Sequence, residues 1–253
     1  MLAIIGGTGL TELENLHVKK RVIVRTPYGE PSQPLIFGEI CGGEVIFLAR
    51  HGTGHTIPPH EVNYRANIYA LYLQGVTEIA AVATVGGIHQ DLSSGVIALP
   101  HQIIDYTHGR QNTYHDGITK SVKHIDFTEP YCPNLRHKIE QAALSIDEKI
   151  VNKGVYAATQ GPRLETAAEI DRLERDGATM VGMTGMPEAA LARELGMSYA
   201  AICPVANYAA GRGDSLHAID YEQVIANINQ TMVRVRKIIA QLMTQHYCDI
   251  KNR

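Results

Sequence analysis

The sequence lacks most features that mark secreted, membrane-spanning or nucleic-acid-binding proteins. Its four cysteines, Cys41, Cys132, Cys203 and Cys248, are widely spaced and form no CxxC pair, which argues against a disulfide framework or a zinc knuckle. No apolar run approaches the length that crosses a bilayer, and the N-terminal MLAIIGGTGL lacks the basic start of an export signal. The net charge of −3 comes from interspersed signs without a basic stripe. We therefore expect a cytoplasmic protein that acts on a small molecule, without nucleic-acid or membrane partners.

The chain also lacks internal repeats, low-complexity tracts and linker-like changes in composition. Its 253 residues with 45% hydrophobic content can form one large core. Strand-like runs alternate with helical patterns, which predicts a single α/β domain over residues 1–253, with a mixed, mainly parallel central sheet flanked by helices. The expected strands are Leu2–Ile5, a meander within 21–50, 78–84, 95–105, 153–159, 178–182 and 198–207; the expected helices are 58–74, 134–146, one opening at 160–166, one from Pro187, and 221–245.

Three glycine-bearing turns, at Gly6, Gly86 and Gly182, each follow a strand-like run. Because neighbouring strands of an open α/β sheet end at one edge, we expect the three turns to build one pocket. The first turn alone is a weak signal, since it lacks the GxGxxG spacing of dinucleotide sites and the lysine of a P-loop. After the third turn, Pro187 and Glu188 begin a helix whose N-terminus suits an anion, although an ordinary strand-to-helix connection is the alternative.

Basic side chains follow the third strand of the meander. Arg50 offers a planar, permanently charged fork that matches two phosphate oxygens, and His51 and His55 can add donors. A solvated strand-end charge is the alternative for Arg50, and a hydrogen-bonding turn residue is the alternative for each histidine.

Hydroxyls and backbone amides complete the candidate oxyanion site. Thr8 and Thr184 lie at two of the glycine turns, and the backbone of Ala83 and Thr84 can supply N–H donors. No DxD, HExxH or paired-cysteine spacing suggests a metal. We expect a phosphate held without metal or cofactor, and such a phosphate can itself be a reactant.

Seven motifs spread over nearly the whole chain carry a resemblance: GGTGL, TPYG, ARHG, HTIPPHEVNYRANI, HIDFTEPYCP, GVYAATQGPRLET and VGMTGMPEAALARELG. Together they resemble the trimeric purine nucleoside phosphorylases, particularly the 5′-methylthioadenosine phosphorylase branch. The resemblance implies the nucleoside phosphorylase fold and phosphorolysis, in which inorganic phosphate attacks the anomeric carbon while the purine leaves. It also implies phosphate ligands at Thr8, Arg50, His51, Ala83, Thr84 and Thr184, with Met183 under the sugar.

The resemblance places Asn207 and Glu165 at the purine. An Asn amide can donate to N7 and face O6 of a 6-oxopurine, whereas adenosine-type relatives have Asp here, in an Asp-Tyr-Asp run; this chain has Asn207-Tyr208-Ala209. Glu165 stands where inosine and guanosine enzymes have a Glu that accepts the N1–H. Both departures favour hypoxanthine or guanine, although a strand-end Asn and a solvated first-turn Glu are the alternatives. Leu164 replaces an aromatic residue that lies against the base in relatives.

The resemblance leaves the 5′ side open. His124 aligns with a histidine that reaches the 5′ pocket of a neighbouring subunit, which implies a homotrimer with sites at subunit interfaces. Either Ile219 or Tyr221 lines this pocket, and an aliphatic group there favours methylthio over hydroxyl. We expect phosphorolysis of S-methyl-5′-thioinosine, with Asn207, Arg50 and His51 as catalytic residues.

Other activities remain as alternatives. Inosine and guanosine phosphorolysis comes second, ahead of methylthioadenosine phosphorolysis and a non-catalytic nucleoside-binding module. A nucleotide-binding dehydrogenase is poorly supported, because this chain lacks the full glycine fingerprint and the acidic residue at the end of the second strand that such an enzyme needs.

Overall fold

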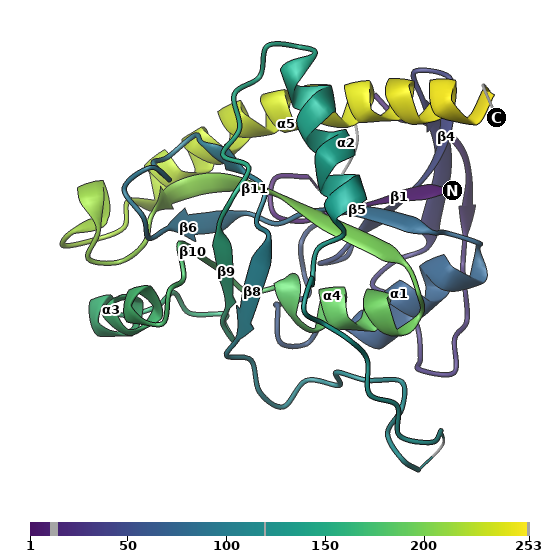
Figure 1. The fold of residues 1–253 in the computed structure, drawn as a ribbon, viewed down its shortest axis with the longest axis horizontal. Coiled ribbons are helices and arrows are strands. Elements are labelled where there is room, and N and C mark those ends of the chain that lie inside the picture. The colour runs from purple at the N-terminus through teal and green to yellow at the C-terminus, as the bar shows by residue number, and fades with distance from the viewer. Residues whose placement is uncertain (11–14, 119, 252–253) are drawn as a thin grey trace.

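A mixed β-sheet forms the centre of the protein in the computed structural model, which describes residues 1–10, 15–118 and 120–251 (Figure 1). Over these residues the sheet has 11 strands, in the order β2-β3-β4-β1-β5-β11-β6-β10-β9-β8, with β7 paired to β11. Six strand pairings are parallel and four are antiparallel, so the predicted mixed, mainly parallel sheet is confirmed. The strands are β1 (Leu2–Gly6), β2 (His17–Val22), β3 (Leu35–Ile40), β4 (Gly43–Ala49), β5 (Glu78–Val82), β6 (Val85–Gly87), β7 (Ile97–Ala98), β8 (Gln102–Asp105), β9 (Val155–Ala158), β10 (Met180–Gly182) and β11 (Ser198–Tyr208).

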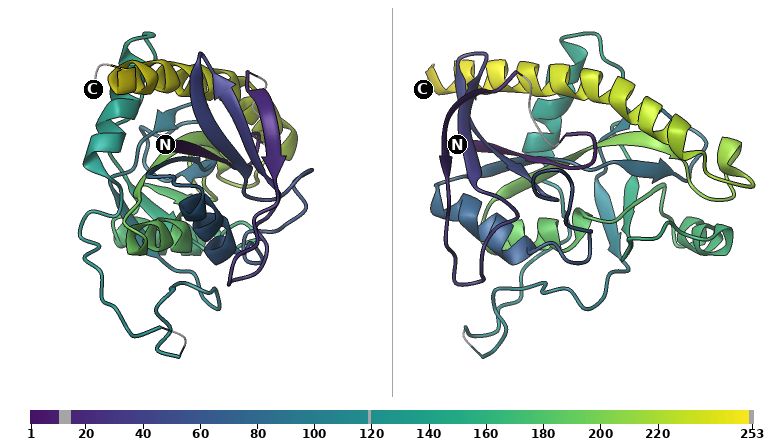
Figure 2. Two further views of the ribbon diagram at one scale, coloured as in Figure 1. Left: turned by 90° about the vertical axis from the view of Figure 1, so that its right-hand side faces the viewer. Right: turned by 180° about the vertical axis from the view of Figure 1, so that it is seen from behind.

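Helices cover both faces of this sheet (Figures 1 and 2). Two helices, α2 and α5, lie across one face, and α1 and α4 lie on the other. The helices are α1 (Tyr64–Leu73), α2 (Pro133–Leu144), α3 (Ala167–Arg175), α4 (Gly185–Glu194) and α5 (Tyr221–Lys251), with a short 3-10 helix at Gly213–Ser215. None of the helices in the described ranges has the length and apolar character needed to span a bilayer.

The two apolar layers follow from the alternation of side chains along each strand. In β1, Leu2 and Ile4 pack in the cluster that includes α2 and α5, whereas Ala3 and Ile5 pack in the cluster that includes α1 and α4. All residues of β1 are buried, as expected for a central parallel strand covered on both faces.

Two helices begin later than predicted, at Tyr64 and at Ala167, and three predictions within the sheet differ from the structure. The first strand of the meander is His17–Val22 instead of a strand over 21–26, and it is an exposed edge strand held by its pairing with β3. The turn predicted at Gly86 is itself a strand, Val85–Gly87, which pairs with β11 and β10. The single strand predicted over 95–105 is two short strands, β7 and β8, separated by residues 99–101, where Pro100 has no N–H for a ladder.

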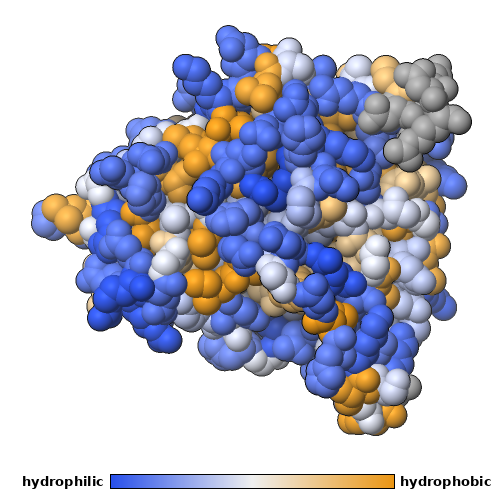
Figure 3. Space-filling view, in the orientation of Figure 1, coloured by the Kyte–Doolittle hydropathy of each residue, from blue (hydrophilic) through white to orange (hydrophobic). Residues whose placement is uncertain are grey.

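A long irregular segment projects from the edge of the molecule below α4 in Figure 1. Residues 106–118 and 120–124 form no helix or strand, in agreement with the polar loop predicted there. The tip of this projection carries hydrophobic surface (Figure 3), and Ile118 and Val122 are 90% and 65% exposed.

Candidate active site

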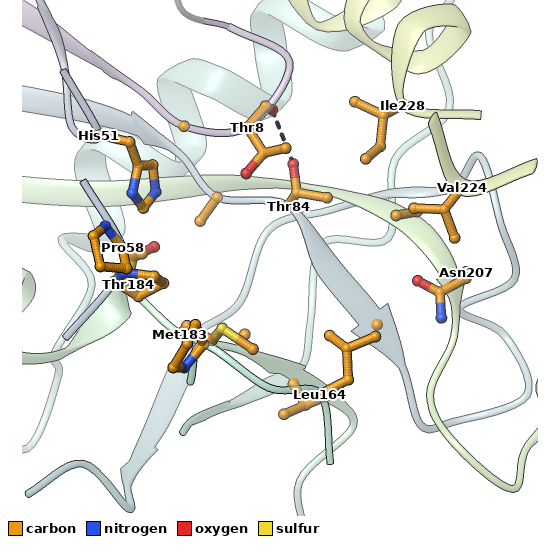
Figure 4. A pocket seen from close by; sticks show the side chains of 18 of the residues that line it. Thr8, His51, Pro58, Thr84, Leu164, Met183, Thr184, Asn207, Val224 and Ile228 are labelled. Carbon is orange, nitrogen blue, oxygen red and sulfur yellow. Dashed lines mark hydrogen bonds between the residues drawn. The ribbon is translucent and has the colours of Figure 1, made fainter. Parts of the chain in front are cut away.

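A cavity of about 490 Å³ opens where β1, β4, β5 and β10 end, a size typical of small-molecule sites. Residues from the two turns after Gly6 and Gly182 line it together with Gly86 of β6, so the three predicted glycine positions do converge. The cavity takes in every sequence-predicted site residue except His124: Thr8, Arg50, His51, Ala83, Thr84, Leu164, Glu165, Met183, Thr184, Asn207, Ala209, Ile219 and Tyr221. In Figure 4, Thr8, Thr84, His51 and Thr184 lie on one side of the cavity, with Asn207 across from them.

Arg50 lies at the end of β4 and is completely buried, so the alternative of a solvated strand-end charge is wrong. Its Nε and Nη2 atoms donate to the two carboxylate oxygens of Glu188, at 2.6 and 2.7 Å, and Nη1 donates to the Val82 carbonyl at 3.0 Å. A guanidinium has five N–H donors, so two remain, one on each Nη atom. Burial alone lowers the pKa of Arg50, but the Glu188 carboxylate outweighs it, and the pKa lies above its ordinary value.

Glu188 was expected only as a first-turn helix residue. The structure buries its side chain completely, and Oε1 also accepts a hydrogen bond from the Tyr199 hydroxyl at 2.8 Å. Arg50 and Glu188 are 138 positions apart, so no local spacing in the sequence predicts that they pair. The only signal in the sequence is an acid within the otherwise apolar run that follows Pro187.

His51 is held as a neutral hydrogen-bond acceptor, in contrast to the donor role expected for it. Its Nδ1 lies 2.8 Å from the Ile57 carbonyl oxygen, and a carbonyl only accepts, so Nδ1 carries the proton. Burial, and then the charge of Arg50, lower the pKa of His51 to about 4. At neutral pH Nε2 is therefore an acceptor, suited to the O–H of a protonated phosphate. The ring of His55 lies against it, with centroids 4.4 Å apart.

The threonine hydroxyls and backbone amides of the cavity differ in whether they already make a hydrogen bond within the protein. Thr184 precedes α4, which is interrupted at Met186 by non-helical backbone, and its side chain makes no capping hydrogen bond to the described residues, so its hydroxyl can face a ligand. The Thr84 hydroxyl donates to the Thr8 carbonyl at 3.1 Å (Figure 4). The expectation that the Ala83 amide is a free donor is wrong, because it donates to the Ile202 carbonyl at 3.1 Å.

The charges on this side of the cavity nearly cancel. The Arg50 charge is matched by Glu188, and His51 is neutral at pH 7. The groups that can attract an anion here are therefore directed donors, which are the remaining Arg50 N–H groups and the hydroxyls of Thr8 and Thr184. This arrangement can orient an oxyanion without a large net positive charge.

Asn207 and Glu165 line the cavity with part of their hydrogen-bonding capacity unused. Asn207 lies at the end of β11, just after an irregularity in its pairing with β6, and its Nδ2 donates to the Tyr208 carbonyl at 2.6 Å. One N–H and the amide oxygen remain. Glu165 precedes the N-cap of α3, Thr166, so the first-turn alternative is wrong. Its Oε1 accepts from the Thr159 hydroxyl at 2.7 Å, which fixes the carboxylate.

The apolar end of the cavity includes both residues that the sequence left as alternatives, Ile219 and Tyr221. Val224 and Ile228 of α5, which were not predicted from the sequence, also line it. Their spacing from Tyr221, at i+3 and i+7, is the signal that could have found them, because such positions share one helix face. His124 is exposed and lies outside this cavity, so its contact with a neighbouring subunit stays a prediction.

The fold and the cavity together define a nucleoside phosphorylase architecture, and residues 1–244 match the sequence model of the phosphorylase superfamily. The chain belongs to this family. Among solved structures, methylthioadenosine phosphorylase from Schistosoma mansoni in complex with adenine superposes with a TM-score of 0.91, at 31% identity over 98% of this chain and 92% of that one.

One bacterial and one archaeal relative are more similar in sequence to this chain than the Schistosoma mansoni enzyme is. A probable S-methyl-5′-thioinosine phosphorylase from Pseudomonas syringae pv. tomato is 48% identical over 96% of this chain and 98% of its own length. A probable 6-oxopurine nucleoside phosphorylase from Thermococcus kodakarensis is 42% identical over 99% of this chain and 96% of its own.

Proposed function

We propose that residues 1–253 form one enzyme domain that converts S-methyl-5′-thioinosine and phosphate to hypoxanthine and 5-methylthioribose 1-phosphate. One observation carries the proposal: a fixed carboxylate, Glu165, and an amide, Asn207, share a cavity with the candidate oxyanion-binding residues Arg50, His51 and Thr184. The name of the Pseudomonas syringae relative supports the same substrate. Inorganic phosphate is the co-substrate, and we assign no metal or organic cofactor.

In the proposed reaction, phosphate binds at Arg50, His51 and the hydroxyls of Thr8 and Thr184. The sugar acquires positive charge as its bond to the purine breaks, and an adjacent phosphate anion stabilises that charge. Holding phosphate and nucleoside in one orientation supplies much of the remaining acceleration. Met183 lies under the sugar.

The departing purine gains negative charge, which Asn207 stabilises by donating its free N–H to N7. The unused oxygen of the Glu165 carboxylate accepts the N1–H of a 6-oxopurine, a hydrogen that adenine lacks. Leu164 and Ala209 complete the walls around the base. The side chains of Ile219, Val224 and Ile228 suit an apolar 5′ substituent, because they offer no partner to a buried hydroxyl.

Phosphorolysis of inosine or guanosine is the second candidate. It is favoured by the 6-oxopurine nucleoside phosphorylase name of the Thermococcus kodakarensis relative, and it uses the same base contacts. Inosine differs from S-methyl-5′-thioinosine only at the 5′ position, where Tyr221 lines the cavity beside the aliphatic side chains, and guanosine carries a 2-amino group on its base in addition.

Base release from methylthioinosine, inosine and methylthioadenosine, measured with and without phosphate, tests the proposal. We expect hypoxanthine release that requires phosphate, fastest from methylthioinosine. Equal release without phosphate overturns phosphorolysis, and a preference for methylthioadenosine overturns the base assignment.

A double variant, Asn207→Asp with Glu165→Ser, tests the base contacts directly. We expect it to raise the ratio of kcat/KM for methylthioadenosine over methylthioinosine. The control, Asn134→Asp with Glu30→Ser, makes the same chemical changes at exposed positions outside the cavity. An unchanged ratio in the double variant contradicts the assignment.

We further propose a cytoplasmic homotrimer in which His124 reaches the 5′ pocket of a neighbouring subunit. The exposure of His124 and the projecting hydrophobic tip at Ile118 and Val122 support this arrangement. Light scattering is expected to give the mass of three 27.7 kDa chains. A monomer in solution contradicts the proposal.

A further inference from the structure

Arg110 makes an unusual set of contacts for a residue in an irregular segment. Its Nη1 donates to the carbonyl oxygens of Met183 and Met186, at 2.7 and 2.6 Å. Its Nη2 donates to the carbonyl oxygens of Gln160 and Thr159, at 2.8 and 3.2 Å. One guanidinium therefore joins four backbone carbonyls from two separate segments of the chain.

These two segments continue from paired strands. The ladder between β9 and β10 ends at the pair Ala158 and Gly182, followed by a hydrogen bond from the Thr159 amide to the Gly182 carbonyl at 2.8 Å. Beyond that point the carbonyls of Thr159, Gln160 and Met183 lie outside the ladder, and buried carbonyls need a donor. Arg110 supplies donors to these three carbonyls, and to that of Met186 near the start of α4, at the place where the two segments separate.

Each segment carries a different side of the proposed site. Thr159 holds Glu165, the proposed base contact, through its hydroxyl. Met183 and Met186 flank Thr184, a proposed phosphate contact. Arg110 itself is absent from the residues that line the cavity, so it acts through the backbone.

The position of the guanidinium is fixed by an aromatic neighbour. It lies over the ring of Tyr64, 5.4 Å from the centroid, and Nη1 is 3.3 Å from the Tyr64 hydroxyl oxygen. Tyr64 is buried at the start of α1. A lysine cannot reproduce this geometry, because its ammonium is a single point with three donors and has no planar fork.

We propose that Arg110 is a positioning residue that fixes the separation between the base-binding and phosphate-binding sides of the cavity. This inference rests on the proposed phosphorolysis. Attack requires the phosphate oxygen and the anomeric carbon to be held about 3–3.5 Å apart, and a misplacement of about 1 Å can cost roughly 100-fold in rate. Loss of Arg110 removes the donors that join the two segments beyond the Thr159–Gly182 hydrogen bond, so kcat falls more than the KM for phosphate or for nucleoside rises.

The test compares Arg110→Ala and Arg110→Lys with Arg136→Ala. Arg136 is a matched control, because it also lies partly buried and donates to the carbonyls of Leu99 and Asn152, at 3.3 Å each. It lies outside the cavity lining. We expect kcat to fall about 100-fold in Arg110→Ala and to recover in part when guanidinium ion is added. In Arg136→Ala we expect kcat to be retained, with no response to guanidinium.

Arg110→Lys keeps the positive charge and provides the same kinetic test if Arg110→Ala does not fold. We expect its kcat to fall at least about tenfold, because the ammonium cannot join both segments. A kcat in the folded Arg110 variants equal to that of Arg136→Ala, or no guanidinium response in Arg110→Ala, overturns the inference.

A binding measurement separates this inference from the proposed reaction. Calorimetry follows hypoxanthine binding at saturating phosphate in each variant. We expect affinity about tenfold weaker in Arg110→Ala than in Arg136→Ala, a typical size for coupling between two sites. If the wild-type protein releases no base from any nucleoside, the proposed reaction fails, and equal hypoxanthine affinities in the two variants then overturn the positioning role separately.

Discussion

Replacing Glu188 with Gln tests how the buried Arg50 charge is maintained. The side chains of Arg50 and Glu188 are 1% and 0% exposed, and the carboxylate accepts two hydrogen bonds from Arg50, at 2.6 and 2.7 Å, and one from Tyr199, at 2.8 Å. Glutamine keeps one acceptor oxygen but directs an NH2 group at an Arg50 N–H and removes the compensating charge. Breaking a buried ion pair in this way costs about 3–5 kcal/mol of unfolding free energy.

For a chain of this length, each kcal/mol lowers Tm by about 2–4 °C, so we expect a decrease of roughly 6–20 °C. Urea denaturation and thermal unfolding in phosphate-free buffer measure the loss. Tyr199→Phe is the control, because it removes one hydrogen bond to the same carboxylate and keeps both charges, at a cost of about 1.5–3 kcal/mol.

Phosphate provides a second readout of the same reasoning. An oxyanion bound at Arg50 restores a negative partner, so we expect phosphate to raise the Tm of Glu188→Gln more than that of Tyr199→Phe. A Glu188→Gln protein no less stable than Tyr199→Phe would falsify the view that the carboxylate is needed to compensate the buried guanidinium.

Two further predictions follow from the same side of the cavity. A Cβ atom at Gly7 would lie 2.6 Å from the Val82 carbonyl oxygen and 2.9 Å from Arg50 Nη1, so Gly7→Ala displaces the guanidinium. We expect steady-state kinetics to give a raised KM for phosphate. An unchanged KM for phosphate argues against phosphate at Arg50. The folded-state pKa of His51, about 4, lies below its ordinary value of 6.5. The unfolded chain therefore binds the proton first, and wild-type stability relative to His51→Asn falls as pH decreases from 6.5 to 4; parallel stability curves over this range contradict a neutral buried imidazole.

Much of the fold could be predicted because its signals are local. The apolar runs of β1, β5 and β11 appear as continuous hydrophobic segments, since each of these strands is buried on its two faces. Edge strand β2 was misplaced because its residues are exposed, and its position depends on pairing with β3. Strand β6 was missed because three residues around a glycine have too little pattern of their own.

The candidate site divides in the same way. Its glycine turns and the residues next to them could be found in the sequence, because each follows a recognisable strand. The hydrogen-bonding capacity that each group has left for a ligand could not be predicted, since it depends on contacts from distant segments. The Ala83 amide is occupied by β11, and the His51 proton is directed to the Ile57 carbonyl.

The sequence by itself determined the α/β class, the strand ends that meet at the cavity and the residue types available for an oxyanion and a purine. Only the tertiary structure decided that Glu188 neutralises Arg50 and that Arg110 joins the two sides of the site. The physical reason is that strand and helix patterns arise from neighbouring residues, whereas hydrogen bonds between groups 138 or 73 positions apart exist only after the whole chain has packed.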